Sequence, residues 1–233
     1  MSDNKDIQGR TRVVVFTGPS LRPQEGAALL DATFLPPVKR GDLVRLSAWK
    51  PRMVGIIDGE FYQNLAVTPK EVLALLDAGV AVYGAASMGA LRAVELERYG
   101  MVGVGSVFRL FRKGVLDADD EVALVYDKET YRPVSEPLVN TRYALRAAVR
   151  RGILTRKDAH RIVEKVSALY FPERTRELVY LIARGVIGAG PAAELRDSLV
   201  KDAPNVKTQD AKRLLARMAR DVSRANLLLV RER

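Results

Sequence analysis

The sequence contains no cysteine and only one histidine, His160. Without cysteine the chain cannot form a disulfide, a thiolate nucleophile, an iron–sulfur cluster or a thiolate zinc site. With one histidine, proton transfer must fall mainly to Asp, Glu, Lys or Tyr side chains. His160 itself lies in the basic helical stretch "TRKDAHRIVEK", where a surface or packing role is the simpler interpretation. We expect neither a metal ion nor a cofactor.

Long hydrophobic runs are missing as well. No stretch approaches the about 18 apolar residues that a membrane-spanning helix requires. The N-terminal "MSDNKDIQGRTR" lacks the apolar middle of a signal peptide. These absences predict a cytoplasmic protein that does not contact a membrane. The chain of 233 residues, 48% of them hydrophobic, is long enough for one large domain or two small ones.

The net charge of +10 is unevenly distributed, with +2 over residues 1–150 and +8 over residues 151–233. A basic C-terminal surface favours an acidic partner, and composition alone leaves nucleic acid, an anionic membrane, an acidic protein or a merely solvated helical surface as alternatives. Because no nucleic-acid-binding motif accompanies the charge, we do not expect nucleic acid to be the partner. Homo-oligomerisation is left open.

The first half alternates short apolar runs with helical patterns, which is typical of βα units around a mainly parallel sheet. Caps and spacing predict strands at 12–17, 42–46, 52–57, 80–84 and 122–126, and helices at 23–32, 68–79 and 87–100. From residue 140 onward the pattern is helical. The expected fold class is therefore α/β, with flanking helices on the sheet, followed by an all-helical C-terminal part. We expect an α/β core over 1–138 and a basic helical region over 139–233 packed on it.

Polar residues follow three of the predicted strands. Thr17 and Ser20 follow the first strand, Asp58 follows strand 52–57, and Ser87 follows strand 80–84. In an open parallel sheet, ligand sites form beyond the carboxyl ends of the strands. We therefore expect the three loops to meet in one pocket.

Ser87 lies in "GAASMG", at the point where a strand turns into a helix. Small neighbours let a substrate approach the hydroxyl, and the first-turn amides, including those of Met88 and Gly89, could hold an oxyanion. The segment lacks the G-x-S-x-G spacing of hydrolases, however, and serine is a preferred N-cap residue. From the residues alone, a helix cap and a nucleophile both remain open.

Charged residues near Ser87 also have two interpretations each. Lys70 lies in the first turn of helix 68–79, where the helix dipole disfavours its charged form, so it could act as a base for Ser87; a solvated lysine is the alternative. Arg92 and Glu95 lie three residues apart on the helix after Ser87. This spacing predicts a partly buried ion pair, and anion binding by Arg92 is the alternative.

Two further segments carry weaker signals. The acidic stretch 117–121 could offer oxygen ligands to a divalent cation, but it fits no calcium-loop spacing, and a solvated turn is the simpler interpretation. The stretch "VGVGSVF" (102–108) does not match G-x-G-x-x-G and does not begin a clear helix by its pattern, which argues against dinucleotide binding.

Seven segments, taken in order, resemble the TfuA-like family. They are "VFTGPSL", "GIIDGEFYQ", "PKEVLALLDAG", "YGAASMGALRAVEL", "YGMVGVGSVF", "LDADDEVALVY" and "PLVNTRYAL", and they span about residues 13–146. The segment "GAASMGALRAVEL" is long and specific. The C-terminal third adds little to the resemblance beyond basic helices.

The resemblance implies a role beside a YcaO enzyme, which uses ATP to activate a backbone amide and converts it to a thioamide. Proteins of this family are associated with releasing sulfide from a thiocarboxylated carrier similar to ThiS, and with helping YcaO engage its substrate. The family's Ser–Lys hydrolase-like site corresponds to Ser87 and Lys70. Some members carry a histidine at the position of Pro69, so the resemblance implies no histidine-assisted step for this chain.

On this basis we expect Ser87 to be the nucleophile and Lys70 its base. Arg92 or Asn140 would orient the carrier's tail, and Asp58 would position Lys70 or water. The alternative is a non-catalytic adaptor that docks YcaO and its substrate, with Ser87 and Arg92 in structural roles.

Overall fold

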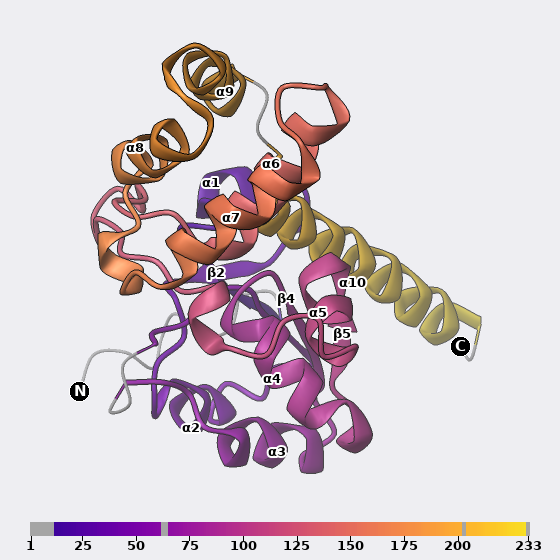
Figure 1. Cartoon of the computed structure of the whole chain (residues 1–233). Coiled ribbons are helices and arrows are strands. Elements are labelled where there is room, and N and C mark those ends of the chain that lie inside the picture. The colour runs from indigo at the N-terminus through magenta and orange to yellow at the C-terminus, as the bar shows by residue number, and fades with distance from the viewer. Residues whose placement is uncertain (1–11, 62–64, 202–203, 232–233) are drawn as a thin grey trace. The chain divides into compact units, whose positions relative to one another are not determined.

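The computed structural model describes residues 12–61, 65–201 and 204–231. It comprises two compact units (Figure 1). The first unit contains the chain up to Leu116 together with the C-terminal residues from Lys207, and the second contains Asp117–Val206. The expected boundary near residue 138 lies within the second unit, and the last helix belongs to the first unit.

Within the described residues, the first unit contains one five-stranded parallel sheet with the order β2-β1-β3-β4-β5. The strands are β1 (Val13–Phe16), β2 (Thr33–Leu35), β3 (Met53–Ile56), β4 (Ala81–Ala85) and β5 (Val102–Val104). The two central apolar runs, β1 and β3, are buried at every position, as expected for strands covered on both faces. The predicted α/β fold with a mainly parallel sheet is confirmed.

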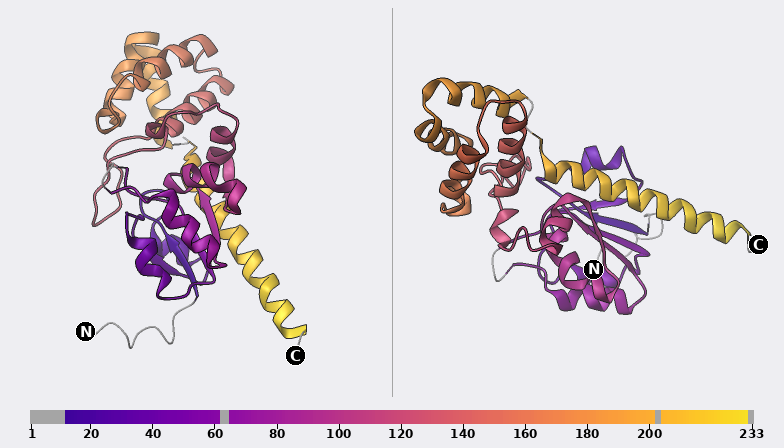
Figure 2. Two further views of the ribbon diagram at one scale, coloured as in Figure 1. Left: turned by 90° about the horizontal axis from the view of Figure 1, so that it is seen from below. Right: turned by 45° about the vertical axis from the view of Figure 1, so that its right-hand side comes forward.

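Helices cover both faces of this sheet (Figure 2). The first-unit helices are α1 (Pro23–Ala27), α2 (Asp42–Ser47), α3 (Pro69–Asp77), α4 (Met88–Leu96), α5 (Gly105–Arg112) and α10 (Val206–Arg231), with the 3-10 turn η1 (Glu97–Tyr99) after α4. Helix α10 packs on one face, where Leu214 and Met218 lie against Val15 and Tyr83 in one apolar cluster. A side chain at Gly55 of β3 would meet the Met218 sulfur at 2.8 Å, so the glycine admits α10.

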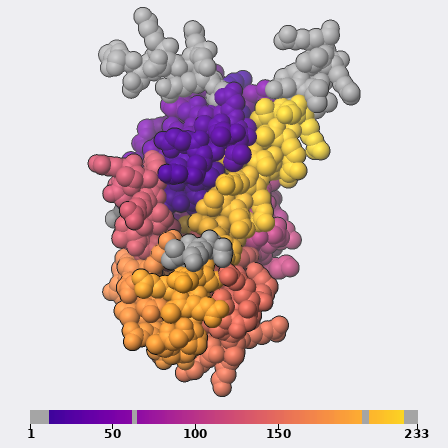
Figure 3. All heavy atoms as spheres, turned by 90° about the horizontal axis from the view of Figure 1, so that it is seen from above, coloured from indigo at the N-terminus to yellow at the C-terminus, as the bar shows by residue number. Residues whose placement is uncertain are grey.

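The space-filling view shows the same packing from another side. The surface of α10, in yellow, lies against the indigo surface of the N-terminal residues (Figure 3). The cluster behind it includes Leu21 and Leu30 together with Leu214 and Leu215. Because these residues are distant in sequence, the C-terminal helix is an integral part of the first core.

The second unit consists mainly of four helices: α6 (Leu138–Arg150), α7 (Arg156–Ser167), α8 (Arg176–Ile187) and α9 (Ala189–Lys201). Two 3-10 turns, η2 (Asp119–Glu121) and η3 (Phe171–Glu173), belong to the same unit. Leu145, Ile162, Val179 and Leu195, one from each of the four helices, are buried in a single cluster. The predicted helical character of this part is confirmed.

Two predicted strands are wrong. Residues 42–46 form α2, because Leu43 and Leu46, three positions apart, are both buried on one helical face. Residues 122–126 form no strand. The amide of Val125 donates to Ser135 Oγ at 2.9 Å and Tyr126 makes a single antiparallel bridge, so this segment pairs within its own loop.

Two short strands, β2 and β5, and one helix escaped the sequence analysis. Helix α5 does begin in "VGVGSVF", at Gly105, contrary to the expectation for this segment. Its first turn is capped from a distant helix, since the Val107 amide donates to the Asp210 carboxylate at 2.7 Å. Gly105 has a φ of 100°, and a side chain there would meet the same carboxylate at 2.3 Å. Helix α1 ends at Ala27, earlier than the predicted residue 32.

Candidate active site

Ser87 lies in the sharp turn between β4 and α4. Strand β4 ends at Ala85, Ala86 has a left-handed φ of 67°, and Ser87 occupies the N-cap position of α4. A left-handed alanine is sparsely populated and is held only by its surroundings. A strand, a sharp turn and a helix with serine at the junction is also the arrangement that presents the nucleophile in α/β-hydrolases. The turn therefore holds Ser87 in a fixed position at the carboxyl end of β4, where it is 2% exposed.

The glycines on either side of Ser87 are required by packing. A side chain at Gly89 would lie 1.8 Å from the Ile56 carbonyl oxygen, and one at Gly84 would lie 2.0 Å from the Gly89 carbonyl oxygen. Glycine is needed where backbones approach this closely. The small residues of "GAASMG" thus bring the start of α4 against the ends of β3 and β4, which the sequence analysis had attributed to substrate access.

The backbone amides of Ser87 and its neighbours have different hydrogen-bond acceptors. The Ser87 amide donates to the Ala85 carbonyl at 2.7 Å, and the Gly89 amide donates to the Ile57 carbonyl at 3.4 Å. Among the described residues, no acceptor is hydrogen-bonded to the Met88 amide. In α/β-hydrolases the amide that follows the nucleophile contributes to the oxyanion hole. The Met88 amide holds the corresponding position here, directly after Ser87.

The helix-cap interpretation of Ser87 is confirmed for its position but not for its side chain. The residue holds the N-cap position, but within the described part of the chain its side chain accepts no capping hydrogen bond from α4. Thr68, at the N-cap of α3, does accept one, from the Glu71 amide at 3.4 Å. The nucleophile interpretation of Ser87 stays a prediction.

Asp58 joins the loops that follow β1 and β3. Its carboxylate accepts from the amides of Gly18 and Ser20, both at 2.9 Å, and from Ser20 Oγ at 2.5 Å. Thr17 Oγ1 donates to the Leu21 carbonyl at 2.6 Å. The expected gathering of Thr17, Ser20 and Asp58 at one edge is confirmed, and all three are buried. Their hydrogen bonds fix the backbone of these loops.

The loop after β3 also reaches Ser87's helix. A side chain at Gly59 would meet Met88 at 2.8 Å, so Gly59 lies directly against the first residue of α4. Strands β1, β3 and β4 are adjacent and parallel, which places their carboxyl ends along one edge. The three loops therefore lie together at this edge, and the pocket expected there stays a prediction.

Lys70 is an exposed residue of the first turn of α3. The predicted cap of this helix is confirmed: Thr68 and Glu71 form a capping box, and the Glu71 carboxylate also accepts from the Gly41 amide at 2.7 Å. Because Lys70 is exposed and Ser87 is 2% exposed, the two side chains lie in different environments. Their pairing stays a prediction.

Arg92 and Glu95 form the predicted ion pair on α4. The Arg92 side chain is 12% exposed and that of Glu95 is 44% exposed, which confirms partial burial. Arg92 Nε is buried and has no partner among the described residues. The role of Arg92 in binding a substrate stays a prediction.

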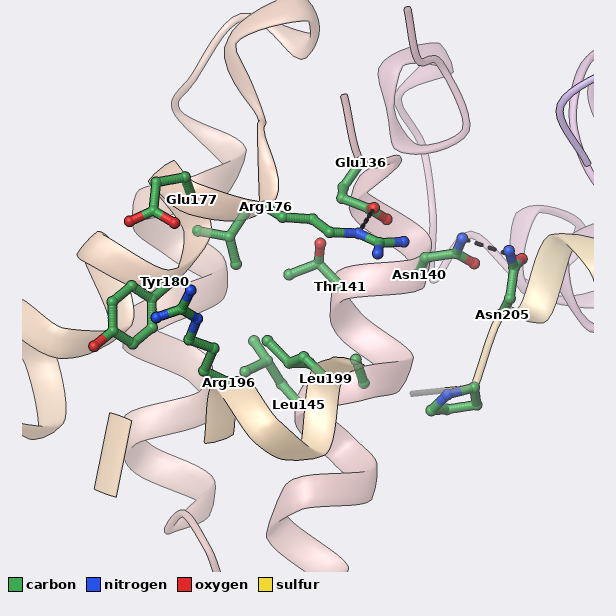
Figure 4. A pocket seen from close by; sticks show the side chains of 13 residues that line it. Glu136, Asn140, Thr141, Leu145, Arg176, Glu177, Tyr180, Arg196, Leu199 and Asn205 are labelled. Carbon is green, nitrogen blue, oxygen red and sulfur yellow. Dashed lines mark hydrogen bonds and ion pairs between the residues drawn. The ribbon is translucent and has the colours of Figure 1, made fainter. Parts of the chain in front are cut away.

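Asn140 belongs to the second unit. Its amide nitrogen donates to Asn205 Oδ1 at 3.2 Å, and its Oδ1 accepts from the Val206 amide at 3.1 Å, so it holds the start of α10. The same residue borders a cavity of about 330 Å³ within this unit (Figure 4). Arg176 pairs with Glu136 at its rim, and the Arg196 guanidinium lies 5.2 Å from the centre of the Tyr180 ring. The expected contact of Asn140 with the carrier's tail stays a prediction.

The acidic stretch 117–121 is held by arginines of its own unit. Glu121 is buried and accepts from Arg142 Nη2 at 2.6 Å. Asp120 accepts from Arg174 Nη2 at 2.5 Å. Among the described residues, no group of three potential metal ligands is found. Asp117 and Asp119 are exposed, as expected for a solvated turn, whereas Glu121 at its end is buried.

The sequence analysis missed two buried charged residues in the first turns of α10. Lys207 is 2% exposed and Asp210 is 0% exposed. Lysine and aspartate are seldom fully buried, so both need a reason. The spacing of Lys207, Ala211, Leu214 and Met218 repeats every three or four residues, and this signal could have placed Lys207 on the buried face of the helix.

The fold and the candidate site together define a class of protein. It is an α/β protein with a buried serine in a sharp strand-to-helix turn at the carboxyl edge of a parallel sheet. A family model described as TfuA-like protein matches residues 58–175, just over half of the chain. The chain belongs to the TfuA-like family.

The match covers Ser87, Lys70 and Asn140 and ends before α10. A search of curated proteins found no match. Membership of the family is consistent with a YcaO-associated role and suggests association with YcaO-type partners. No described helix has both the length and the apolar character needed to cross a membrane.

Proposed function

We propose that this protein is the partner of a YcaO enzyme in backbone thioamidation, and that it releases sulfide from a thiocarboxylated carrier similar to ThiS. Membership of the TfuA-like family supports the pathway. The turn that holds Ser87 beside the Met88 amide supports the chemistry. Sulfide released beside a docked YcaO enzyme would be used before it diffuses away.

The reaction proceeds through an acyl enzyme. Ser87 Oγ loses its proton to a lysine and attacks the thiocarboxyl carbon of the carrier's C-terminus, and the Met88 amide stabilises the oxyanion. The carbon–sulfur bond breaks, and the sulfur leaves with the bonding electrons and takes the proton from the lysine, so that hydrosulfide is released. Water then hydrolyses the serine ester, which yields the carrier carboxylate and restores the Ser87 hydroxyl. Lys70 is the base suggested by the family resemblance.

The observation that carries this proposal is the position of Ser87 at the carboxyl edge, with Asp58 and Gly59 in the adjacent loop. Ligand sites of open parallel sheets form at this edge. Since Ser87 is 2% exposed, the reaction requires a narrow substrate such as an extended chain terminus, which enters as side chains at the edge move aside.

Replacement of Ser87 by alanine tests the proposal. We expect Ser87→Ala to lower the rate of sulfide release from a purified thiocarboxylated carrier by more than about a hundredfold, because the nucleophile is lost. Ser106→Ala is the matched control. Ser106 lies on the neighbouring helix α5, and within the described part of the chain its hydroxyl accepts hydrogen bonds from the side chains of Arg109 and Arg213. Undiminished release by Ser87→Ala would remove Ser87 as the nucleophile.

A second candidate function is a non-catalytic adaptor that docks YcaO and its substrate. The burial of Ser87 and the exposure of Lys70 favour this alternative. Thioamidation assays with two sulfur sources separate the functions. If Ser87→Ala supports thioamidation with free sulfide but not with the carrier, the protein has both roles. If it supports both reactions fully, only the adaptor role remains.

A further inference from the structure

We propose that the cavity in the second unit binds the C-terminus of a partner peptide whose last residue is apolar. The α-carboxylate of that residue binds Arg196 of α9, and its side chain packs on the apolar lining of the cavity. The inference goes beyond the proposed function and does not rest on it, because the cavity lies in the helical unit and Ser87 lies in the sheet unit.

The cavity has the size and the lining of a binding site. Its volume of about 330 Å³ falls within the range of about 300–1,000 Å³ that ligand pockets occupy. Its walls come from helices α6, α8 and α9, and they include the apolar side chains of Ala144, Leu145, Val179 and Leu199. An apolar lining with a few polar groups is typical of sites that bind a ligand in one orientation.

Arg196 is the cationic group of the cavity that is available to a ligand. Its guanidinium lies over the Tyr180 ring, 5.2 Å from the ring centre, and within the described residues it has no hydrogen-bond or ion-pair partner. The other arginine of the lining, Arg176, is paired with Glu136. Because stacking leaves the donors at the edge of the guanidinium plane free, Arg196 can bind a carboxylate with two parallel hydrogen bonds.

Thr141 contributes a second polar group without a partner. Its side chain is buried, with the residue 7% exposed, and in the part of the chain that the structure describes its hydroxyl makes no hydrogen bond. Buried polar groups are normally hydrogen-bonded, so this hydroxyl points to a ligand. In Figure 4 the Thr141 hydroxyl and the Arg196 guanidinium both lie above the side chains of Leu145 and Leu199.

A single chain-terminal residue complements all three features. Its carboxylate suits Arg196, its backbone N–H can donate to the Thr141 hydroxyl, and its apolar side chain suits the leucines. An internal aspartate or glutamate offers the carboxylate without the apolar side chain. A phosphate is a poorer match, because Glu136 and Glu177 also line the cavity and would repel a second negative charge.

Binding of a short peptide to the full chain tests the inference. The probe is Gly-Ser-Gly-Ser-Leu, labelled with fluorescein at its N-terminus and ending in a free carboxylate, and fluorescence anisotropy measures its dissociation constant. We expect the same peptide with an amidated C-terminus to bind about tenfold more weakly or worse, because the charge-assisted hydrogen bonds to Arg196 are lost. A peptide ending in serine should also bind more weakly, since it lacks the apolar contact.

Two variants assign the binding to the cavity. Arg196→Gln should weaken binding of the free-carboxylate peptide by about tenfold or more and leave the amidated peptide unchanged. Thr141→Val, which removes only the unpartnered hydroxyl, should weaken binding by about three- to tenfold. Arg184→Gln is the matched control, since Arg184 is an exposed arginine of α8 that does not border the cavity. The melting temperatures of the variants show that folded protein is being compared.

Three results would overturn the inference. They are equal affinity for the free and amidated peptides, unchanged affinity in Arg196→Gln, and no saturable binding up to about 1 mM of peptides ending in leucine, valine or phenylalanine. Displacement of the probe by free leucine as readily as by unlabelled peptide would also overturn it, because the cavity would then bind an amino acid. Ser87→Ala should bind the peptide normally, so this inference and the proposed function fail independently.

Discussion

Arg174 in the second unit and Lys207 in the first unit are both cationic residue types with almost no exposure, 0% and 2% respectively. The Arg174 guanidinium donates to the carbonyls of Leu169, Ser167 and Asp120 and to the Asp120 carboxylate. Lys207 instead shares a face of α10 with Ala211, Leu214 and Met218, which pack in the apolar cluster against the sheet.

A buried cation can serve either structure or chemistry, and the residue type decides which role it suits. A planar guanidinium with fixed donors and a permanent charge suits a site that holds loops together. A lysine amine can lose its proton and therefore suits proton transfer. We accordingly expect changes at Arg174 to affect folding, and changes at the carboxyl edge of the sheet to affect sulfide release.

The largest expected effect on stability is that of Arg174→Met. Removal of the buried guanidinium takes its donors from the carbonyls of Leu169, Ser167 and Asp120, so the free energy of unfolding should fall by about 3–5 kcal/mol. Arg176→Met is the matched control. Its side chain is 76% exposed and pairs with Glu136, so the change should cost less than about 1 kcal/mol. Denaturant unfolding measures both, and equal stability of the two variants would break the comparison.

A pair of glycine variants contrasts the packing of the two units. Gly89→Ala in the first unit places a methyl group 1.8 Å from the Ile56 carbonyl oxygen, and should lower the free energy of unfolding by about 1–3 kcal/mol or more. Gly185→Ala in α8 of the second unit meets no described atom within 4 Å and should raise it by about 0.5–1 kcal/mol. Thermal unfolding should therefore shift in opposite directions. A stabilised Gly89→Ala would show that α4 does not need this close approach.

The smallest effect concerns pH and Tyr83. Burial, a hydrogen bond to Asp221 and the charge of that carboxylate raise the pKa of Tyr83 from 10.0 to about 12. The unfolded tyrosine loses its proton first, so this contribution to stability is complete below pH 10 and is lost as the pH rises from about 10 to about 12. Ultraviolet titration should show one late tyrosine that is missing in Tyr83→Phe, and that variant should lose less stability over the same range.

Titration of all eight tyrosines together near their ordinary pKa would contradict the Tyr83 prediction. Burial raises the pKa of Asp221, but hydrogen bonds from Arg217 and Tyr83 outweigh this effect and lower it overall. The pair therefore keeps Tyr83 neutral and Asp221 charged, which links β4 to α10 at 2.9 Å.

Local sequence patterns were sufficient to predict much of the secondary structure of the first unit. Apolar β-branched runs predicted β1 and β3, and the Thr68, Pro69 and Gly79 signals predicted α3 with its cap. The strand, turn and helix around Ser87 were also readable, because each is encoded within a few residues. The predicted meeting of Ser20 and Asp58 followed from the parallel order alone.

Local patterns failed where distant residues decide the structure. Residues 122–126 are apolar enough for a strand, but they pair with their own loop near Ser135. The start of α5 is set by Asp210, which lies 103 residues from Val107 in the sequence. The short strands β2 and β5 gain their stability from the neighbouring strands β1 and β4.

The sequence by itself determined the class of fold, the family resemblance and the serine at the end of β4, because periodicity and turn residues act over short distances. Only the tertiary structure decided that α10 completes the first core, that Gly84 and Gly89 serve close packing, and that Lys207 is buried while Lys70 is exposed. Burial and close approach depend on which distant elements meet, and a linear pattern does not contain that information.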